Sequence, residues 1–556
     1  MPAKKSVTRR KASSSKASKP TAKSKSSKVE SSEIAALRSA RKHLEKALEL
    51  NPDYAEAHFN LANLLVKLGE QDTARTHFQH AIKLNPDYAD AHCQFARLLA
   101  VLGENDEAKK HFSLTLDLNP NHAEAYYQFA LLLISLNEFE EAKSHLEKAS
   151  EIEQNFAQAY YHKARILRHP EEFVEAGKNY EIAIDIRPDF VDALYYFAKL
   201  LAGGRTVDKD GMPTFRKDPA TAKTHFKEVI RLDPEFSKAY YNLARIEVDE
   251  RKPTAAKKNL ETAIRLDPSY SKAHFLLAKI LAAGNSVRKA EEHFLLSIKH
   301  HQENPEAHYH YGLLLAKRTD FKAAVASFKS AIKHDPEHSQ AHYNIALAYV
   351  ELNKLDKARD HFLLSVDYDS DFAPAWYHLG HVMESLHMVN ETKAYFEKAT
   401  QVDQNYTDAY YNLGRVLNAP GEFDLARRNY ETAAEISPDN ADVHYGLGKL
   451  LAGGQKITKD GTLICEPDHK NAAKHYGRAI EIDPNHSKAH FHYALLLQDI
   501  GDSKNARKHY ERAIKIDPSY ARAHYHLALL LNEEIAAVEM DKASKALTRA
   551  GGSATS

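Results

Sequence analysis

The chain has 556 residues, of which 43% are hydrophobic, and its 76 Lys and Arg residues equal its 76 Asp and Glu residues in number. It contains no run of about eighteen apolar residues, so the sequence predicts no membrane span, and the N-terminus lacks the apolar core of a secretory signal. The two cysteines, Cys93 and Cys465, lie far apart in the sequence. A disulfide framework is therefore excluded, and we expect an intracellular protein, cytoplasmic or nuclear, in a reducing compartment.

Residues 1–30 form a basic segment rich in Ser and Lys. They hold ten Lys or Arg residues against one acidic residue, Glu30. The segment has no Leu, Ile, Phe, Tyr or Trp, so it cannot bury enough apolar surface to order itself, and we expect it to be disordered. Three interpretations stay open: a solubilising tail, a nuclear localisation signal or nucleic-acid arm that contacts importin or nucleic acid, and an organelle transit peptide.

Residues 31–50 are predicted to form an N-terminal capping helix. Ala40, Leu44 and Ala47 match the small, large and small positions of a second helix before Pro52. The preceding segment cannot supply a partner helix, so this helix caps the stack.

Residues 51–534 consist of one unit repeated fourteen times. Eleven of the thirteen intervals are 34 residues long and the other two are 46. A proline closes most units, at Pro52, Pro86, Pro120, Pro188, Pro234, Pro268, Pro336, Pro438, Pro484 and Pro518. A fixed period of this size is typical of a solenoid, in which each unit buries its apolar face only by stacking on its neighbours.

Each unit is predicted to be a helical hairpin. In the first copy, apolar residues recur at helical spacing over residues 54–68 and again over residues 72–84, and Gly69 stands between them, where a helix end favours positive φ. The position of Ala62 is Ala or Gly in all fourteen copies. Two helices in so short a unit must approach closely, and a methyl group is about all that the contact can hold.

The two long intervals carry similar insertions, near residues 203–217 and 453–467. Both contain Gly-Gly followed by Lys-Asp-Gly, and Asp-Gly between short Thr, Val and Ile segments predicts a small hairpin. Asp218 followed by Pro219 is a good helix start. The insertions lie 250 residues apart, so we infer that a block of seven repeats was duplicated. They are either neutral inherited loops or docking elements.

At the C-terminus, residues 520–532 read as a normal first helix. Residues 535–550 are expected to form its companion, a C-terminal capping helix. Met540 and Ser544 stand where Ala and an aromatic residue belong, and such departures from the consensus are expected of a terminal cap that must face water. Residues 551–556 are expected to be a disordered tail.

Residues at equivalent positions of the repeats form columns. These columns resemble the consensus of the tetratricopeptide repeat (TPR) family: a large residue, Leu, a small residue and Leu in the first helix, then Ala, an aromatic residue and Ala in the second, then Pro. The resemblance covers about residues 34–550. It implies an all-α fold, a right-handed α-solenoid superhelix of about fourteen helix pairs. It also implies that the first helices line a concave groove that holds peptides or partner proteins.

Three columns of the first helices are the predicted groove residues. The aromatic column is expected to supply anchors with an apolar face and a polar tip; its tyrosines are Tyr127, Tyr161, Tyr195, Tyr241, Tyr309, Tyr343, Tyr377, Tyr411, Tyr445 and Tyr525. The next column holds Asn60, Asn242, Asn344 and Asn412, and one turn later stand Arg97, Arg165, Arg245 and Arg415. Asn residues in a comparable column hold peptide backbones in the long TPR superhelix of protein O-linked N-acetylglucosamine transferase, which the chain resembles without a catalytic region.

No catalytic motif, cofactor site or metal site is predicted. No Gly-rich phosphate loop, nucleophile elbow or isolated acid pair interrupts the repeats, and most of the 33 His residues follow the repeat columns instead of zinc-ligand spacing. We therefore expect a non-enzymatic scaffold or adaptor. The alternatives are a nucleic-acid-associated or nuclear protein that acts through residues 1–30, and a targeting subunit of a glycosyltransferase-like complex.

Overall fold

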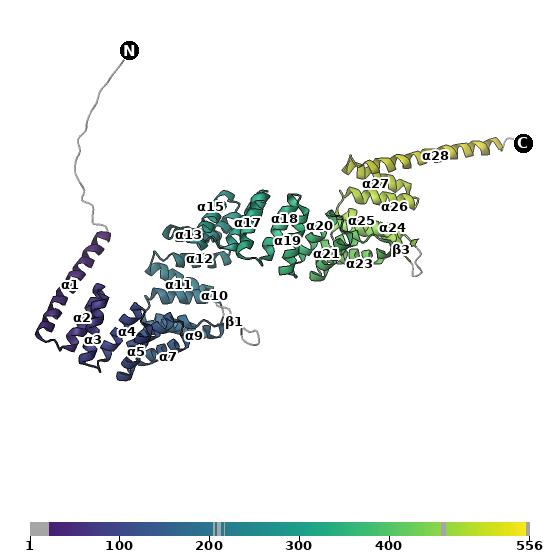
Figure 1. Cartoon of the computed structure of the whole chain (residues 1–556). Helices are drawn as coiled ribbons and strands as arrows, with labels where there is room; N and C mark the ends of the chain where they lie inside the picture. Colours follow the sequence, from purple (N-terminus) through teal and green to yellow (C-terminus); the bar gives the residue numbers. More distant parts are fainter. Residues whose placement is uncertain (1–21, 204–205, 208–212, 216, 458–462, 552–556) are drawn as a thin grey trace, which may run out of the picture. The chain divides into compact units, whose positions relative to one another are not determined.

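The computed structural model describes residues 22–203, 206–207, 213–215, 217–457 and 463–551 of the chain. Over this part of the chain it contains twenty-eight α-helices, two 3₁₀ turns and two β-hairpins (Figure 1). The chain divides into two compact units, Met1–Pro268 and Ser269–Ser556. Each unit is a stack of antiparallel helix pairs, as the predicted α-solenoid requires.

The first unit contains thirteen of the helices. In chain order its elements are α1 (Ala22–Leu50), α2 (Ala55–Leu68), α3 (Gln71–Leu84), α4 (Ala89–Leu102), α5 (Asn105–Leu118), α6 (Ala123–Ser135), α7 (Phe139–Ile152), α8 (Ala157–Ile166), the 3₁₀ turn η1 (Pro170–Glu172), α9 (Phe173–Ile186), α10 (Val191–Gly203), β1 (Thr206–Val207), β2 (Pro213–Phe215), α11 (Pro219–Leu232), α12 (Ser237–Asp249) and α13 (Pro253–Leu266).

The second unit repeats this arrangement. Its elements are α14 (Ser271–Ala283), α15 (Val287–His300), α16 (Pro305–Lys317), α17 (Phe321–His334), α18 (Ser339–Glu351), α19 (Leu355–Tyr368), α20 (Ala373–Ser385), α21 (Val389–Val402), α22 (Thr407–Val416), the 3₁₀ turn η2 (Pro420–Glu422), α23 (Phe423–Ile436), α24 (Ala441–Gly453), β3 (Gln455–Ile457), β4 (Leu463–Cys465), α25 (His469–Ile482), α26 (Ser487–Asp499), α27 (Ser503–Ile516) and α28 (Ala521–Gly551).

The turn inside each helix pair uses the left-handed backbone region. Gly69 ends α2 with φ of 80°, as predicted, and its backbone N–H donates to carbonyls of the last helical turn. Several later repeats place Asn at this turn, for example Asn137 with φ of 63°. Asn tolerates this region better than most side chains, so the same turn forms without glycine.

The small-residue column lies where the two helices of a pair touch. Ala62 is fully buried. A Cβ atom added to Gly312 would lie 2.5 Å from the ring of Phe328, and one added to Gly380 would lie 2.7 Å from the ring of Phe396. In these two repeats the aromatic residue of the second helix therefore packs directly on the small residue of the first helix, as the predicted close approach requires.

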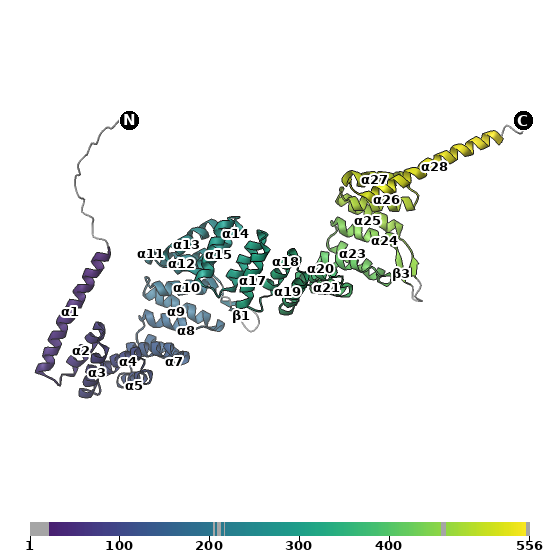
Figure 2. The same cartoon turned by 45° about the horizontal axis from the view of Figure 1, so that its top comes forward.

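Both insertions contain the predicted antiparallel hairpin. Gln455 pairs with Cys465 and Ile457 with Leu463, whereas the pairing of β1 with β2 is irregular. The Asp-Gly turns lie outside the described residues. In both views the strand β3 lies beside α23 and α24 (Figures 1 and 2), and it contacts η2 and α23. In the first unit, β1 contacts η1 and β2 contacts α9.

The repeat before each hairpin has a shortened first helix, which the sequence analysis did not predict. Helices α8 and α22 end after ten residues and are followed by η1 and η2. Pro170 and Pro420, 250 residues apart, open these turns. Proline disfavours helical conformation in the residue before it, so the signal for an early helix end was present in the sequence.

The two ends of the chain differ from their predicted boundaries. Helix α1 begins at Ala22 instead of Ser31, and residues 1–21 of the predicted tail lie outside the described residues. The predicted break between residues 532 and 535 is wrong, because α28 runs without interruption from Ala521 to Gly551. Residues 532–535, Asn-Glu-Glu-Ile, contain no glycine or proline to end the helix. Residues 552–556 lie outside the described residues.

Candidate functional site

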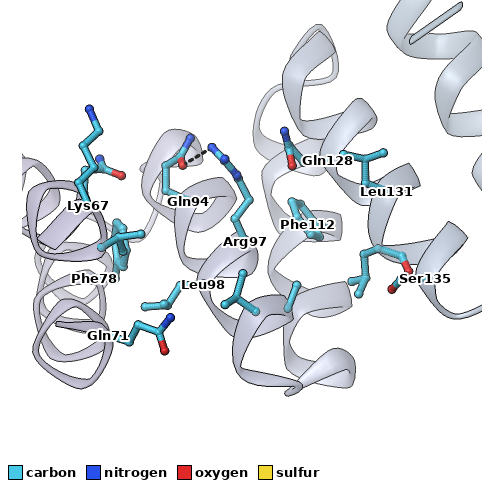
Figure 3. A pocket seen from close by; sticks show the side chains of 15 residues that line it. Lys67, Gln71, Phe78, Gln94, Arg97, Leu98, Phe112, Gln128, Leu131 and Ser135 are labelled. Carbon is cyan, nitrogen blue, oxygen red and sulfur yellow. Dashed lines mark hydrogen bonds between the residues drawn. The ribbon is translucent and has the colours of Figure 1, made fainter. Parts of the chain in front are cut away.

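The first helices of three successive repeats, α2, α4 and α6, line a cavity of about 460 Å³. Lys67 comes from α2, Gln94 and Arg97 come from α4, and Gln128 and Leu131 come from α6 (Figure 3). We call this cavity the α2–α4–α6 groove. It lies on the face of the first helices, where the predicted concave groove was expected.

The α2–α4–α6 groove combines an apolar surface with polar side chains. Its floor includes the buried rings of Phe78 and Phe112, and Val101 on its rim is 72% exposed. Arg97 donates a hydrogen bond of 2.8 Å from Nη1 to the side-chain oxygen of Gln94 (Figure 3). Gln128 donates from Nε2 to Glu124 at 2.7 Å. The groove can therefore take an apolar side chain and offer hydrogen-bonding groups beside it.

Most of the predicted aromatic column lies between repeats. The rings of Tyr127, Tyr161, Tyr195 and Tyr309 are buried, those of Tyr241, Tyr343, Tyr377, Tyr411 and Tyr445 are half-buried, and Tyr525 is 61% exposed. The ring of Tyr127 packs 4.8 Å, between centroids, from Phe156, which begins the next repeat, and Tyr343 packs in the same way on Phe372. Tyr525 lies on α28, and among the described residues no later helix packs against it.

These contacts make the aromatic column a packing element that joins successive repeats. Burial raises the pKa of Tyr127, Tyr161 and Tyr445 to about 12, as expected for phenols shielded from water. None of the column tyrosines lines the α2–α4–α6 groove. A role for these tyrosines in partner binding stays a prediction.

Side chains of the Asn column form hydrogen bonds within the chain. Asn242, Asn344 and Asn412 each donate from Nδ2 to the hydroxyl of the tyrosine one repeat earlier, at 3.2 Å, and also to the backbone carbonyl four residues before. An amide nitrogen has two hydrogens, so both donors of these side chains are used within the chain. The side-chain oxygen of Asn412 also accepts a hydrogen bond from Nε of Arg415 at 3.1 Å. Asn60 belongs to α2 and is exposed. In the described part of the chain, no tyrosine of the aromatic column precedes it.

The four predicted arginines have different surroundings. Arg97 lines the α2–α4–α6 groove. Arg165 stacks over the ring of Tyr196, with its guanidinium carbon 4.6 Å from the ring centroid. Arg415 makes two hydrogen bonds of 2.7 Å to Glu384. Arg245 is exposed on α12. The predicted arginines therefore do not form one continuous basic strip.

Among the predicted site residues, Arg97 lines the α2–α4–α6 groove, and two further lining residues belong to a predicted column. Gln94 and Gln128 belong to the same column as Asn60, and Lys67, Val101 and Ser135 form another column with the 34-residue spacing. The signal was available, because residues three or four positions apart share one face of a helix. The prediction selected Tyr, Asn and Arg by residue type and did not consider which other residues lie on the same helix face.

The repeated histidines form pairs inside the helix hairpins. The Nδ1 atoms of His92 and His111 lie 2.8 Å apart, and Nε2 of His92 lies 3.0 Å from the backbone oxygen of Pro86. The same pairing occurs at His58 with His77, His274 with His293, His342 with His361, His444 with His475 and His490 with His509. Among the described residues, no group of three or more His, Cys, Asp or Glu side chains could hold a metal ion.

Within the described part of the chain, no helix is both long enough and apolar enough to cross a membrane. This finding concerns α1–α28 alone.

Family models described as TPR repeat or tetratricopeptide repeat match most of the chain. Together their matches span residues 43–100, 111–166, 241–308, 311–406, 414–453 and 475–533. No curated protein matches the sequence.

The chain is also similar to solved structures. One is YrrB, described as a TPR protein with an unusual peptide-binding site, with 25% identity over 36% of this chain and 96% of that one and a TM-score of 0.30. A second is the APC/C hetero-tetramer Cut9–Hcn1, with 14% identity over 90% and 95% and a TM-score of 0.34. A third is yeast Tom70, with 16% identity over 86% and 96% and a TM-score of 0.31.

Proposed function

The chain belongs to the tetratricopeptide repeat family, and we propose that it is a non-catalytic scaffold or adaptor that holds extended segments of partner proteins in the α2–α4–α6 groove. Three successive first helices contribute to this one cavity of about 460 Å³, and this observation carries the proposal. An extended segment presents side chains and backbone groups along a line. A groove built from equivalent positions of a repeat presents its own groups along a line as well.

The side chains of the α2–α4–α6 groove suit such a segment. Gln94 and Gln128 are half-buried, so their amides are held in place, whereas Lys67 and Arg97 are exposed to solvent. Val101 offers an exposed apolar surface beside them. Amides can pair with the N–H and C=O groups of a peptide backbone, and apolar surface between them supplies affinity without selecting one sequence.

Affinity capture with matched variants tests this function. Gln94→Ala combined with Arg97→Ala removes polar groups from the groove but leaves the buried Phe78 and Phe112 in place. We expect partner proteins recovered by the native chain to be lost from this variant. The control combines Lys110→Ala with Lys148→Ala, two exposed positions on the second helices α5 and α7. Equal recovery by both variants, measured by quantitative mass spectrometry, would contradict the proposal.

A further inference from the structure

The helices α1 and α28 each hold one half of a repeat. Helices α2 and α3 of the first complete pair have 14 residues each, whereas α1 has 29 and α28 has 31. Helix α1 ends at Leu50, the repeat position of Leu84 at the end of α3, so it is a second helix with an extension before it. Helix α28 begins at Ala521, the repeat position of Ala55 at the start of α2, so it is a first helix with an extension after it.

The face that joins the two helices of a pair is exposed on both α1 and α28. Ala40 of α1 occupies the position of Ala74, which is fully buried, but Ala40 is exposed. Ala528 of α28 occupies the position of Ala62, which is also fully buried, but Ala528 is exposed. Among the described residues, no helix covers either alanine. Each of these helices therefore presents a pairing face without a partner.

The histidine pairs show the same two missing halves. His43 on α1 stands 34 residues before His77, at the second-helix position of these pairs, and His524 on α28 stands 34 residues after His490, at the first-helix position. Nε2 of His524 lies 3.1 Å from the backbone oxygen of Pro518, as in the complete pairs. Both side chains are exposed, and in the described part of the chain neither has a histidine partner. Helix α1 therefore carries the half of a pair that α28 lacks.

The register of the complete pairs also fits α1 and α28. In the pair of α16 and α17, Phe328 of the second helix packs on Gly312 of the first. The equivalent positions are Leu44 of α1 and Ala528 of α28. An antiparallel pair of α1 and α28 in this register therefore places a large side chain against a small one, as the complete pairs do.

The two extensions lie side by side in this register, because a second helix begins next to the end of its first helix. Each step along one antiparallel helix is a step back along the other, so Leu37 faces Ile535 and Ile34 faces Val538. Ile34 is 42% exposed, Ile535 is 60% exposed and Val538 is 53% exposed. Both helices project beyond the helices packed on them (Figures 1 and 2). Exposed apolar residues in a row indicate a surface that contacts another molecule.

The charges of the two faces are complementary. Residues 34–48 of α1 contain four basic residues and one acidic residue, Glu45, whereas residues 524–541 of α28 contain four acidic residues and no Lys or Arg. The basic residues are Arg38, Arg41, Lys42 and Lys46, and the acidic residues are Glu533, Glu534, Glu539 and Asp541. Opposite charges favour contact between α1 and α28, whereas two α1 helices or two α28 helices repel each other.

We propose that α1 of one copy of this chain packs antiparallel on α28 of a second copy and completes a helix pair across the two chains. Repeats of a solenoid contact their neighbours in the chain, so the second copy supplies the missing helix. The two copies use different surfaces, and each keeps one unpaired helix, so further copies can add head to tail. The contact lies outside the α2–α4–α6 groove and does not depend on the proposed function.

Two blocking variants test this contact. Ala40→Glu and Ala528→Glu each place a bulky charged side chain where the complete pairs have room for a methyl group. Both alanines are exposed, so each variant should fold, and thermal melting by circular dichroism verifies this. In sedimentation velocity over about a hundredfold range of concentration, the native chain should grow from one copy to two and more by mass action. Each variant alone should remain a single copy.

A mixture of the two variants tests the direction of the contact. Ala40→Glu keeps a native α28 and Ala528→Glu keeps a native α1, so one contact forms and no third copy can add. We expect assemblies of two copies and nothing larger. A contact between two α1 helices would let Ala528→Glu associate alone, and a contact between two α28 helices would let Ala40→Glu associate alone. Either result overturns the proposal.

Matched controls place the same charge beside the pairing faces. Ser39→Glu on α1 and Leu529→Glu on α28 change exposed positions and should associate like the native chain. Loss of association in these controls as well would show that charge alone, and not the pairing face, is responsible, and it overturns the proposal. A native chain that remains a single copy throughout, or a mixture that does so, also overturns it.

Discussion

The side-chain amide of Asn344 donates a hydrogen bond of 3.2 Å to the hydroxyl of Tyr309, which lies one repeat earlier. The same nitrogen donates to the backbone carbonyl of Gln340 at 2.8 Å. Asn412 bonds in the same way to Tyr377. The Tyr and Asn columns, whose residue types are those of a peptide-binding face, therefore connect the repeats of this chain through hydrogen bonds.

The contact between Asn344 and Tyr309 is expected to stabilise the second unit. Asn344→Ala and Tyr309→Phe should each lower the free energy of unfolding by about 0.5–1.5 kcal/mol, the usual net contribution of a hydrogen bond. The double variant should lose less than the sum of the two, because both changes remove the same bond. Urea unfolding followed by the fluorescence of Trp376, the one tryptophan of the chain, measures this coupling. Strictly additive losses would show that the bond contributes nothing.

The small-residue column should not tolerate larger side chains. Ala346 is fully buried on α18, so Ala346→Leu overpacks the helix contact and should cost about 1–3 kcal/mol. Ala244→Leu is expected to have the same effect in the first unit, where Ala244 is also fully buried. Because repeats support their neighbours, limited proteolysis should also cut adjacent repeats faster. The matched control is Ala326→Leu, at an exposed position of α17, which should melt like the native chain.

The histidine pairs should make stability depend on pH. Burial, together with the neighbouring His342 and His490 respectively, lowers the pKa of His361 and His509 to about 4. In the unfolded chain these groups have their ordinary pKa of about 6.5. Between these values the unfolded chain binds protons that the folded chain does not bind. The stabilisation is therefore present above pH 6.5 and is lost as the pH falls toward 4.

Urea midpoints at pH 7.5, 6.0 and 5.0 measure this effect. We expect the midpoint of the native chain to fall with each step of acidification. His361→Gln combined with His509→Gln removes two of the groups and should give a shallower fall. A fall of the same size in the native chain and in this variant would show that other groups cause the acid sensitivity.

The Cys93 thiol should be unreactive in the folded chain. Its side chain is fully buried, and burial raises its pKa to about 12. The thiolate is the reactive form, so iodoacetamide at pH 8 should leave Cys93 unmodified until urea unfolds the first unit. Mass spectrometry of the Cys93 peptide reports this site separately from Cys465. Rapid labelling of Cys93 without urea would contradict the packing described for α4.

The sequence predicted the repeat fold well, because the small-residue and aromatic columns recur in phase and meet inside each helix pair. It predicted the site less well for a physical reason. A column shows which residues share a face of the first helix. Residues on that face can contact the second helix, contact the next repeat or be exposed to solvent. Tyr127 contacts the next repeat, whereas Arg97 faces solvent in the groove. Only the stacked structure separates these cases.

The missed boundaries of α8 and α28 have different causes. The end of α8 before Pro170 was predictable from the residue alone, since proline disfavours a helical residue before it. The continuity of α28 depends instead on what is absent from residues 532–535. The repeat pattern predicts a turn in this segment because the earlier units have one, but no residue of the segment favours a turn.

Site-specific photo-crosslinking tests the central claim, that partners bind in the α2–α4–α6 groove. A photoreactive phenylalanine analogue is placed at Val101, which is 72% exposed in the groove, and separately at Lys110, an exposed position on the second helix α5. We predict that the Val101 chain crosslinks to a partner protein in cells, and that Gln94→Ala with Arg97→Ala removes that product. Crosslinks to partners from position 110, with none from position 101, would contradict the account and move binding to the second-helix surface.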